Sequence, residues 1–501
     1  MIDNATICAI ATPPGNGAIS ILRLSGKDTY AIAAKLVAFP SGGKNIDQLP
    51  ANSIHFTRIV SGEETIDEVL ISLFRAPHSY TGEDLIEISC HGAVFIQQRI
   101  LELLIGAGAR IAEPGEFTMR AFLNGKMDLS QAEAVADLIA SSSEASHRVA
   151  INQMRGGFSS ELARLREQLL NFISLIELEL DFSEEDVEFA DRNDLQELVS
   201  KISGLILVLK NSFQMGNVIK NGVPVAITGK TNVGKSTLLN ALLHDERAIV
   251  SEIAGTTRDV IEDVITMDGL SFRFIDTAGL RNTSDTIESI GIGKTFEKIK
   301  QAYIVLYVID ATQEIKEIDR LIGKIKIRIS RIGSEGQAVE ESGSRGSKSK
   351  GINQSSQPGK NVRNHKLVIL FNKIDFLSEK QLAALSDPSK FNNMEAEDNV
   401  LQISASYGEN IDTLASLLLE LVRGDQKGGD DVIITNARHF EALSHAGEAI
   451  ERVAEGLKSG LSSDLVAQDI RQVLHYLGEI TGEVTTDEIL GNIFSKFCIG
   501  K

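Results

Sequence analysis

The chain has 501 residues, of which 43% are hydrophobic and 24% are charged, and this predicts a soluble globular protein of about three domains. Its formal net charge of −19 disfavours broad nonspecific attraction to nucleic acid, so any RNA contact is expected to be local or shared with a partner. No apolar run of membrane-spanning length, no signal-peptide pattern and no paired cysteines occur, so we expect a cytoplasmic protein without membrane segment, disulfide framework or zinc site.

Residues 1–120 alternate short β-rich runs with turn signals such as "PPGNG" and "YTGED". The clearest runs are Ala18–Leu24, Glu68–Phe74 and Leu85–Cys90. Short strands bounded by Gly- and Pro-containing turns are typical of a sheet, and the pattern predicts a compact α+β domain.

A helical period begins in residues 121–215. Ser130 and Glu133 fit a capping box at the start of a helix. Apolar residues then recur at helical spacing from Leu162 to Leu180, which predicts a bundle helix of four or five turns.

A second helical segment occupies residues 425–501, where an apolar stripe runs from Val466 to Leu477. Residues 216–424 lie between the two helical segments and alternate strands with helices. We therefore predict a helical domain interrupted by an inserted α/β domain. Within the insert, residues 330–364 are rich in Gly, Ser, Lys, Arg and Gln; they predict a disordered surface insertion, with a functional basic arm as the alternative.

The pattern G-x-x-x-x-G-K-S runs from Gly229 to Ser236, directly after a predicted strand and at the start of a predicted helix. This context is that of a phosphate-binding P-loop. Gly229 and Gly234 permit a tight turn whose backbone N–H groups point at phosphate oxygens. Lys235 is expected to reach the β- and γ-phosphates, and the Ser236 hydroxyl to bind Mg²⁺.

Further elements follow in a consistent order. Thr257, in "GTTRD", is placed to complete the Mg²⁺ shell, and Asp276 stands at a strand end, where a carboxylate can meet the metal through water. Gly279 lets the backbone approach a γ-phosphate. Each signal alone is weak, but the set predicts a nucleotide hydrolase.

The base is predicted from "VILFNKID", which places Asn372, Lys373 and Asp375 after another strand. The Asp375 carboxylate can accept two hydrogen bonds from guanine, a pair that adenine does not offer. Residues 402–406, "QISAS", fit a backbone loop on the base. The predicted strands form a mostly parallel sheet with its ligand site at their carboxyl ends; they are Val223–Thr228, Phe272–Ile275, Ile304–Ile309 and Lys366–Phe371.

Three stretches make a more specific resemblance: "ATICAIATPPGNGAISILRLSG", "PGEFTMRAFLNGKMDLSQAEAVADLI" and the terminal "IFSKFCIGK". With the P-loop set, the chain resembles the MnmE (TrmE) family of bacterial tRNA-modification GTPases over essentially its whole length. The resemblance implies a multidomain α/β protein with an N-terminal α+β folate-binding domain that dimerises, a discontinuous α-helical domain and an inserted Ras-like P-loop G domain.

The resemblance also implies the activity. A potassium-activated GTPase would act with the FAD protein MnmG, in a heterotetramer or larger complex, and with NADH used by that partner. Together they would add an aminomethyl or carboxymethylaminomethyl group to C5 of the wobble uridine, U34, of certain tRNAs. The one-carbon unit is taken to come from 5-formyl- or methylene-tetrahydrofolate.

Leu280 stands where Ras-type GTPases carry the glutamine that orients the attacking water. The resemblance implies that the G domains pair across the nucleotide face instead, with potassium beside the phosphates and Glu288 acting on the attacking water through a bridging water. The implied potassium ligands are Asn232, Ser251, Ile253 and Thr256. For Arg258, a catalytic role and a role in an exposed helix cap or ion pair both remain possible predictions. Lys235 and Asp276 complete the predicted catalytic set.

The whole GTP-contacting set implied by the motifs comprises the P-loop, the two switch segments and the base loops. Its members are Asn232, Val233, Gly234, Lys235, Ser236, Thr237, Ser251, Glu252, Ile253, Ala254, Gly255, Thr256, Thr257, Asp276, Thr277, Ala278, Gly279, Asn372, Lys373, Asp375, Ser404, Ala405 and Ser406.

For folate, the resemblance implies contacts from Arg23, Glu87, Lys126 and Lys501. A carboxylate suits a pterin ring, and basic groups suit folate carbonyls or its glutamate. Cys498 lies beside the last of these residues, so a reactive role stays open against the commoner role of a small packing residue.

Two alternative hypotheses fit the sequence less well. A GTPase switch for ribosome assembly would usually carry a basic RNA-binding module, which the charge of −19 does not suggest. A folate-binding scaffold with a vestigial G domain conflicts with the complete set of phosphate, Mg²⁺ and guanine residues.

Overall fold

The computed structural model describes residues 5–40, 45–181, 192–244, 249–250, 263–275, 299–342, 365–395, 397–423 and 433–501. They form two compact units. The first comprises Met1–Ala140, Ala150–Asn211 and Asn436–Lys501, and the second comprises Ser141–Val149 and Ser212–Thr435. In the described part of the chain, no helix has both the length and the apolar character needed to cross a membrane.

The first unit contains an N-terminal seven-stranded sheet in the order β3-β4-β5-β6-β2-β1-β7. Its strands are β1 (Ile7–Ile10), β2 (Ile19–Ser25), β3 (Val37–Ala38), β4 (Ser53–Ser61), β5 (Glu64–Phe74), β6 (Leu85–His91) and β7 (Arg110–Ile111). The helices of this part are α1 (Thr29–Ala34), η1 (Ile46–Gln48), α2 (Val94–Gly106) and α3 (Glu116–Leu123). The three strands predicted from β-rich runs are confirmed as β2, β5 and β6.

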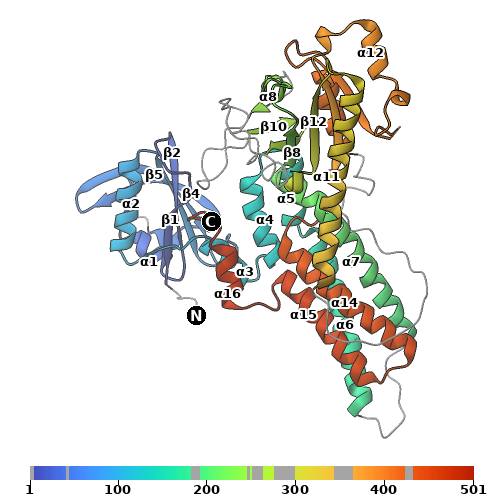
Figure 1. The fold of residues 1–501 in the computed structure, drawn as a ribbon. Helices are drawn as coiled ribbons and strands as arrows, with labels where there is room; N and C mark the ends of the chain where they lie inside the picture. Colours follow the sequence, from blue (N-terminus) through green and yellow to red (C-terminus); the bar gives the residue numbers. More distant parts are fainter. Residues whose placement is uncertain are drawn as a thin grey trace. The chain divides into compact units, whose positions relative to one another are not determined.

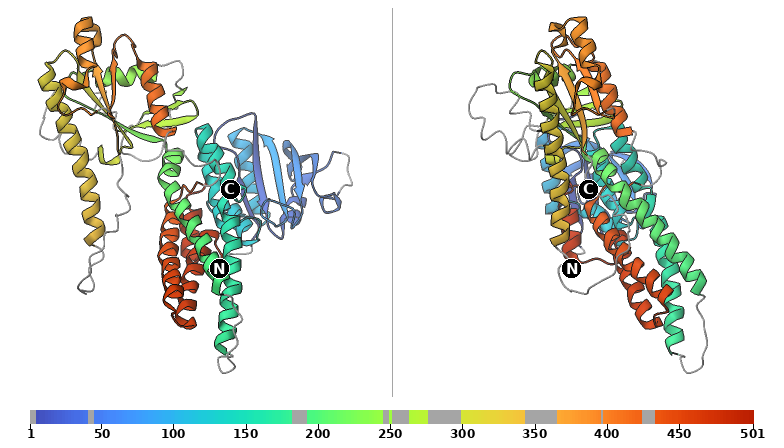
Figure 2. Two further views of the ribbon diagram at one scale, coloured as in Figure 1. Left: turned by 90° about the vertical axis from the view of Figure 1, so that its right-hand side faces the viewer. Right: turned by 45° about the vertical axis from the view of Figure 1, so that its right-hand side comes forward.

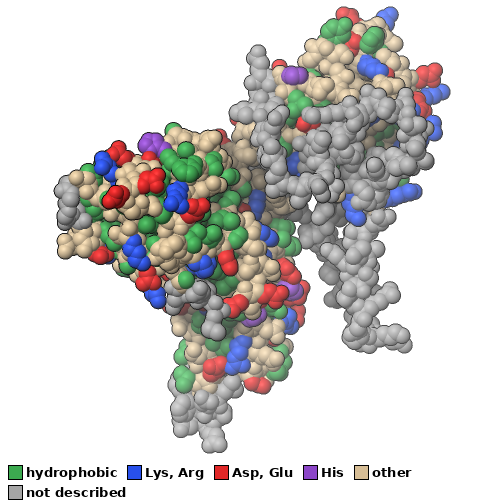
Figure 3. Space-filling model, turned by 90° about the vertical axis from the view of Figure 1, so that its left-hand side faces the viewer, with side chains coloured by type: hydrophobic (Ala, Val, Ile, Leu, Met, Phe, Trp, Pro, Cys, Tyr) green, Lys and Arg blue, Asp and Glu red, His purple; other side chains and the backbone are tan. Residues whose placement is uncertain are grey.

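The two faces of this sheet differ because side chains alternate along each strand. One face packs Leu22, Leu24 and Ile88 against Ile100 and Leu104 of α2, which Figure 1 shows lying along the sheet. The opposite face carries large apolar side chains that stay exposed: Ile19 (67%), Ile54 (67%), Phe56 (52%) and Leu70 (46%). Phe56 and Leu70 are direct cross-strand partners. Hydrophobic side chains are visible among charged ones on the face of the N-terminal domain seen in Figure 3.

The rest of the first unit is helical. Its helices are α4 (Leu129–Ala140), the end of α5 (Glu144–Met154), α6 (Gly157–Asp181), most of α7 (Arg192–Asn221), α14 (Ala437–Ser459), α15 (Ser463–Thr481) and α16 (Asp487–Phe494). Helices α6, α14 and α15 run side by side (Figure 2), although about 250 residues of chain separate α6 from α14. The predicted helix over Leu162–Leu180 is α6. The predicted helical domain made of two distant segments is thereby confirmed.

The capping box predicted at Ser130 and Glu133 is wrong by two residues. Asp128 accepts hydrogen bonds from the Gln131 backbone N–H (2.8 Å) and the Ser130 hydroxyl (2.8 Å), while the Gln131 side chain accepts from the Asp128 N–H (2.8 Å). Both four-residue patterns satisfy the rule for a cap, because Asp and Gln serve as well as Ser and Glu. Glu133 is thus left for another role.

Glu133 forms a buried ion cluster with the start of α14. Its carboxylate accepts hydrogen bonds from Arg438 Nε (3.0 Å) and Nη2 (2.9 Å) and lies 2.7 Å from His439 Nε2. Burial alone would raise the pKa of Glu133, but the charges and hydrogen bonds of His439 and Arg438 outweigh it and lower the pKa to about 2. The cluster joins the first and second halves of the helical domain.

Replacing Glu133 by Gln is expected to lower the stability of the helical domain by about 3 kcal/mol at neutral pH, since it leaves Arg438 and His439 without their carboxylate. Because the pKa is depressed, this contribution is present above the unfolded-state value of about 4.3 and is lost as the pH falls toward about 2. Denaturant unfolding of both proteins between pH 7 and pH 3 measures it. Glu161→Gln, which breaks an exposed pair with Arg164, is the control; a constant difference at all pH values would contradict the assignment.

The second unit is built on a sheet in the order β14-β13-β12-β8-β11-β10-β9. Its strands are β8 (Val223–Thr228), β9 (Ile249–Val250), β10 (Asp263–Met267), β11 (Leu270–Phe274), β12 (Ile304–Asp310), β13 (Lys366–Asn372) and β14 (Asn399–Ile403). Its helices are α8 (Lys235–Leu243), α11 (Ile315–Ser342), η2 (Ile374–Phe376), α12 (Glu379–Leu385), η3 (Pro388–Lys390) and α13 (Ile411–Arg423). From β14 to β11 all neighbours are parallel, as predicted, and β10 and β9 are antiparallel.

The insertion predicted to be disordered over residues 330–364 needs correction at its start. Helix α11 continues to Ser342, while residues 343–364 lie outside the described part. A helix that is already nucleated gains one hydrogen bond for each added residue, so it can extend beyond its apolar stripe. The loss of apolar periodicity near Ser330 therefore did not mark the end of the helix.

Candidate functional site

The loop between β8 and α8 packs tightly against two neighbouring strands. Gly229 has φ +149°, and a Cβ there would lie 2.3 Å from the Val308 carbonyl oxygen. Gly234 has φ +96°, and a Cβ there would lie 2.2 Å from Asn372 Nδ2. Left-handed backbone and the absence of space both require glycine at these two positions. The close approach places the N-terminus of α8 at the carboxyl end of the sheet.

The Lys235 side chain folds back onto this loop. Its ammonium group donates a 3.0 Å hydrogen bond to the Gly229 carbonyl and another to the Lys230 carbonyl. Asn232, at the exposed tip, has φ +61°, a conformation that Asn tolerates better than most residues. Together with the positive end of α8, this cradle fits a phosphate chain.

Asn372 connects the phosphate end of the site to the base end. Its amide donates to the Val233 carbonyl (2.8 Å), and its carbonyl accepts from the Ala405 N–H (3.0 Å). One buried side chain therefore ties the P-loop to the loop after β14. The Ser404 hydroxyl donates to Asp375 Oδ1 (2.6 Å), which fixes the orientation of the predicted guanine-reading carboxylate.

Asp310 is a residue of this site that the motifs did not reveal. Asp310 is the last residue of β12, and its Oδ2 accepts a 2.6 Å hydrogen bond from the Lys373 ammonium group. The backbone of Lys373 has φ +70°. Burial alone would raise the pKa of Asp310, but hydrogen bonds from Lys373 and Thr312 lower it below its ordinary value. The sequence does show that Asp310 lies at the end of a strand. That this strand is next to β13, and so brings Asp310 to the site, is known only from the order of the sheet.

The two predicted switch segments lie outside the described residues. The predicted site residues among them are Ser251, Glu252, Ile253, Ala254, Gly255, Thr256, Thr257, Arg258, Asp276, Thr277, Ala278, Gly279 and Glu288. Ser236 is thus the described member of the predicted Mg²⁺ set, and Asn232 is the described member of the predicted potassium set. The described residues hold no group of three or more His, Cys, Asp or Glu side chains suited to a metal ion.

A second polar site lies in the N-terminal domain. Arg23 and Glu87 are cross-strand partners in β2 and β6, joined by a 2.8 Å hydrogen bond from Arg23 Nε. Arg23 also donates to the Gly500 carbonyl (3.2 Å), which brings the last residues of the chain to this pair. Gly500 has φ +95°, and a Cβ there would lie 2.5 Å from the Ile10 carbonyl oxygen.

Lys501 completes the cluster that the resemblance implied. Burial, followed by the charge of Arg23, lowers the pKa of Lys501, while the Glu87 carboxylate acts in the opposite direction. Lys126 donates to the Pro77 carbonyl (3.0 Å) rather than to the pair itself. The structure thus brings Arg23, Glu87 and Lys501 together, while Lys126 is hydrogen-bonded to the 77–82 loop that carries Tyr80.

Tyr80 also belongs to the Arg23–Glu87 site, although the sequence did not predict it. The Arg23 guanidinium lies over its ring at 5.4 Å from the centroid, and its hydroxyl is 2.8 Å from that of Thr118. Burial raises the pKa of Tyr80. In the sequence it looks like the first residue of a turn, so no local signal distinguishes it.

The three cysteines differ in environment. Burial raises the pKa of both Cys8 and Cys90 to about 11, so neither is suited to act as a thiolate. Cys498 is exposed, and its carbonyl accepts a hydrogen bond from the Gly115 N–H (3.4 Å). The backbone around Cys498 is therefore docked on the N-terminal domain while its side chain stays accessible.

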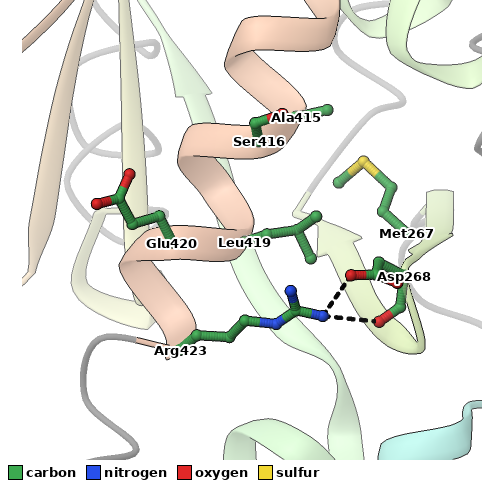
Figure 4. Close-up of a pocket in the computed structure, with 7 residues that line it drawn as sticks. All are labelled: Met267, Asp268, Ala415, Ser416, Leu419, Glu420 and Arg423. Atoms are coloured by element: carbon green, nitrogen blue, oxygen red, sulfur yellow. Dashed lines mark hydrogen bonds and ion pairs between the residues drawn. The ribbon is translucent and has the colours of Figure 1, made fainter.

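A cavity of about 770 Å³ lies elsewhere on the second unit, between α13 and the turn from β10 to β11 (Figure 4). Met267 and Leu419 form its apolar part, and Arg423 reaches across to hydrogen-bond Asp268. None of the residues predicted for nucleotide or folate lines this cavity.

Two family models match the chain: the MnmE helical domain over residues 129–498, and the GTP-binding protein TrmE N-terminus over residues 6–126. A tRNA modification GTPase MnmE of Christiangramia forsetii is 52% identical over 499 residues, covering 99% of each chain. A protein of the same name from Bacteroides fragilis is also 52% identical, over 497 residues and 99% of each chain. Among solved structures, Era in complex with MgGDPNP and 16S ribosomal RNA matches 45% of this chain and 65% of its own, with 24% identity and a TM-score of 0.24.

Proposed function

Because the chain belongs to the MnmE family of tRNA modification GTPases, we propose that it hydrolyses GTP in order to modify the wobble uridine of tRNA. The observation that carries the GTPase part is Asn372, which joins the phosphate cradle to the Ser404–Ala405 loop beside Asp375. This link holds the phosphate-binding loop and the base-binding loop in a fixed relation, which suits one guanine nucleotide that contacts both loops. We also propose that the protein acts in the cytoplasm, where its tRNA substrates are.

In the proposed reaction, the backbone N–H groups of the P-loop and the Lys235 ammonium hold the phosphates in line. Ser236 and Thr257 would hold Mg²⁺, and Asp276 would meet it through water. Asn232, Ser251, Ile253 and Thr256 would hold potassium. These cations, when bound, supply positive charge where negative charge develops. Glu288 acts on the attacking water through a second water, in place of the glutamine that Leu280 replaces.

We propose that a tetrahydrofolate derivative, 5-formyl- or methylene-tetrahydrofolate, binds at the Arg23–Glu87 pair. The pair fits this group because Glu87 offers a carboxylate to ring N–H donors, while Arg23 and Lys501 offer cations to carbonyl or carboxylate groups. Lys126, which donates to the Pro77 carbonyl, would offer a further basic group to the folate. Cys498 is exposed next to Lys501, and its role in the transfer is part of the proposal.

The proposed assembly is a homodimer that works with the FAD protein MnmG, in which NADH acts, as a heterotetramer or larger complex. The open sheet face with Ile19, Ile54, Phe56 and Leu70 supports dimerisation through the N-terminal domain, since a monomer leaves these apolar side chains in water. The proposed product is an aminomethyl or carboxymethylaminomethyl group on C5 of U34.

Replacing Arg23 by Gln is expected to weaken binding of 5-formyl-tetrahydrofolate by about 10- to 100-fold, because a charge-assisted hydrogen bond is lost. Calorimetric titration of the full-length protein measures this, with GTP turnover expected to stay unchanged. Arg58→Gln is the matched control, since Arg58 pairs with Glu68 on the same sheet without contacting Gly500. Equal affinity in the wild type and the Arg23 variant would contradict the folate assignment.

The overall function is tested by deleting the gene and measuring modified wobble uridine in total tRNA by mass spectrometry. We expect the modified nucleoside to disappear, with normal ribosome profiles. Defective ribosome profiles with intact tRNA modification would instead favour a ribosome-assembly GTPase.

A further inference from the structure

Helix α11 has two chemically different sides. Ile318, Leu321, Ile322 and Ile325 are buried in the core beneath it. A row of exposed basic side chains lies on the opposite side, here called the basic stripe: Lys316, Arg320, Lys324, Arg328 and Arg331.

The spacing of the basic stripe follows from helix geometry. Its first four members are separated by four residues each, so successive side chains lie about 6 Å apart along the axis and on nearly the same side. From Lys316 to Arg331 the stripe is about 22 Å long at 1.5 Å per residue. Such a row presents its charges linearly rather than as a compact cluster.

Few acidic residues lie in the same segment of the helix. Residues 316–331 contain six Lys and Arg and two acidic residues. Asp319 is buried and accepts hydrogen bonds from Asn393, and Glu317 is shared between Lys230 and Arg320. Among the described residues, Lys316 and Lys324 have no ion-pair partner.

The flank of the helix behaves differently. Lys326 lies 2.6 Å from Asp398 and 3.5 Å from Glu395, so this lysine is neutralised within the domain. Lys316 and Lys324, which have no ion-pair partner in the described part of the chain, both lie on the solvent side of α11. The basic charge of this segment contrasts with the net charge of −19 of the whole chain.

We propose that the basic stripe binds the phosphodiester backbone of the tRNA substrate. A linear row of long, flexible cations matches a linear polyanion, and phosphate contacts supply most of the affinity of protein–nucleic acid binding. A protein partner fits less well, because protein interfaces are depleted in lysine at their centre and depend on buried aromatic or apolar anchors. Within residues 316–331, whose side chains the structure describes, Ile327 (56% exposed) is the single exposed large apolar side chain.

This inference rests on the proposed function, in which tRNA is the substrate. It adds the location of the surface that binds the tRNA. The stripe begins beside the nucleotide site, since Lys230 of the P-loop lies 2.7 Å from Glu317 on α11. Bound tRNA would therefore lie near the loop that holds the phosphates of GTP.

The test compares binding of a fluorescently labelled, unmodified tRNA transcript to the full-length protein between 50 and 200 mM KCl. The double variant Lys316→Gln/Lys324→Gln is expected to bind on the order of tenfold more weakly than wild type, with a salt slope shallower by about 2. Lys324→Glu is expected to weaken binding further than Lys324→Gln. GTP turnover and thermal unfolding are expected to match wild type, which excludes a folding defect.

The matched control is Lys380→Gln/Lys390→Gln, which removes the same charge from exposed positions elsewhere in the second unit. Equal tRNA affinity and salt slope in the two double variants would overturn the inference, as would a wild-type protein that hydrolyses GTP but binds no tRNA. Unaltered wobble uridine in the deletion strain would contradict the proposed function instead, whatever the stripe binds.

Discussion

An Asp375→Asn variant is expected to bind GTP about 100-fold more weakly and to gain affinity for XTP. The Asp375 carboxylate, oriented by the Ser404 hydroxyl at 2.6 Å, is placed to accept two hydrogen bonds from the N1–H and amino group of guanine. Asn can accept only one of these and presents an N–H to the other, which suits the 2-oxo group of xanthine. Unmatched polar groups of this kind cost on the order of 1–3 kcal/mol each.

Nucleotide titrations with GTP, XTP and ATP, followed by turnover measurements, check this prediction. Asp412→Asn, an exposed carboxylate on α13, is the control and is expected to leave all three affinities unchanged. A variant of Asp375 that kept its preference for GTP over XTP would show that the base is read elsewhere. The Asn372 link, with Ala405 at 3.0 Å, would then serve the fold rather than the nucleotide.

GTP turnover is expected to be much faster in potassium than in sodium, and Glu288→Ala is expected to lower it by about 100- to 1,000-fold while nucleotide binding is kept. The physical reason is that Glu288 positions the attacking water, a role of general-base type, while the cation neutralises charge on the phosphates. Rates in matched chloride salts, with binding measured in parallel, separate the two effects.

Glu379→Ala, an exposed acidic residue on α12, serves as the control for Glu288→Ala. Turnover that is indifferent to the cation and survives the Glu288 change would remove both assignments together. Leu280 would then again leave the attacking water without a positioning residue, and Arg258→Ala would be the next variant to measure.

The sequence by itself determined the features whose residues are contiguous. The P-loop is one such feature, because Gly229 to Ser236 form a turn and a helix start within eight positions. The sequence also predicted the strands β8, β12 and β13 and the helix α6, because the apolar pattern of each element is local. The prediction that Asp375 selects guanine rests on a contiguous motif in the same way. Even here the start of α4 was misplaced, because two overlapping patterns satisfy one capping rule.

Only the tertiary structure decided which distant residues meet. Glu133 pairs with Arg438 across 305 positions, Arg23 with Gly500 across 477, and Lys373 with Asp310 across 63. No local propensity encodes such pairings, because they depend on sheet order, strand register and the packing of whole helices. The basic stripe of α11 has the same origin: its spacing is visible in the sequence, but its exposure depends on which side of the helix the sheet covers.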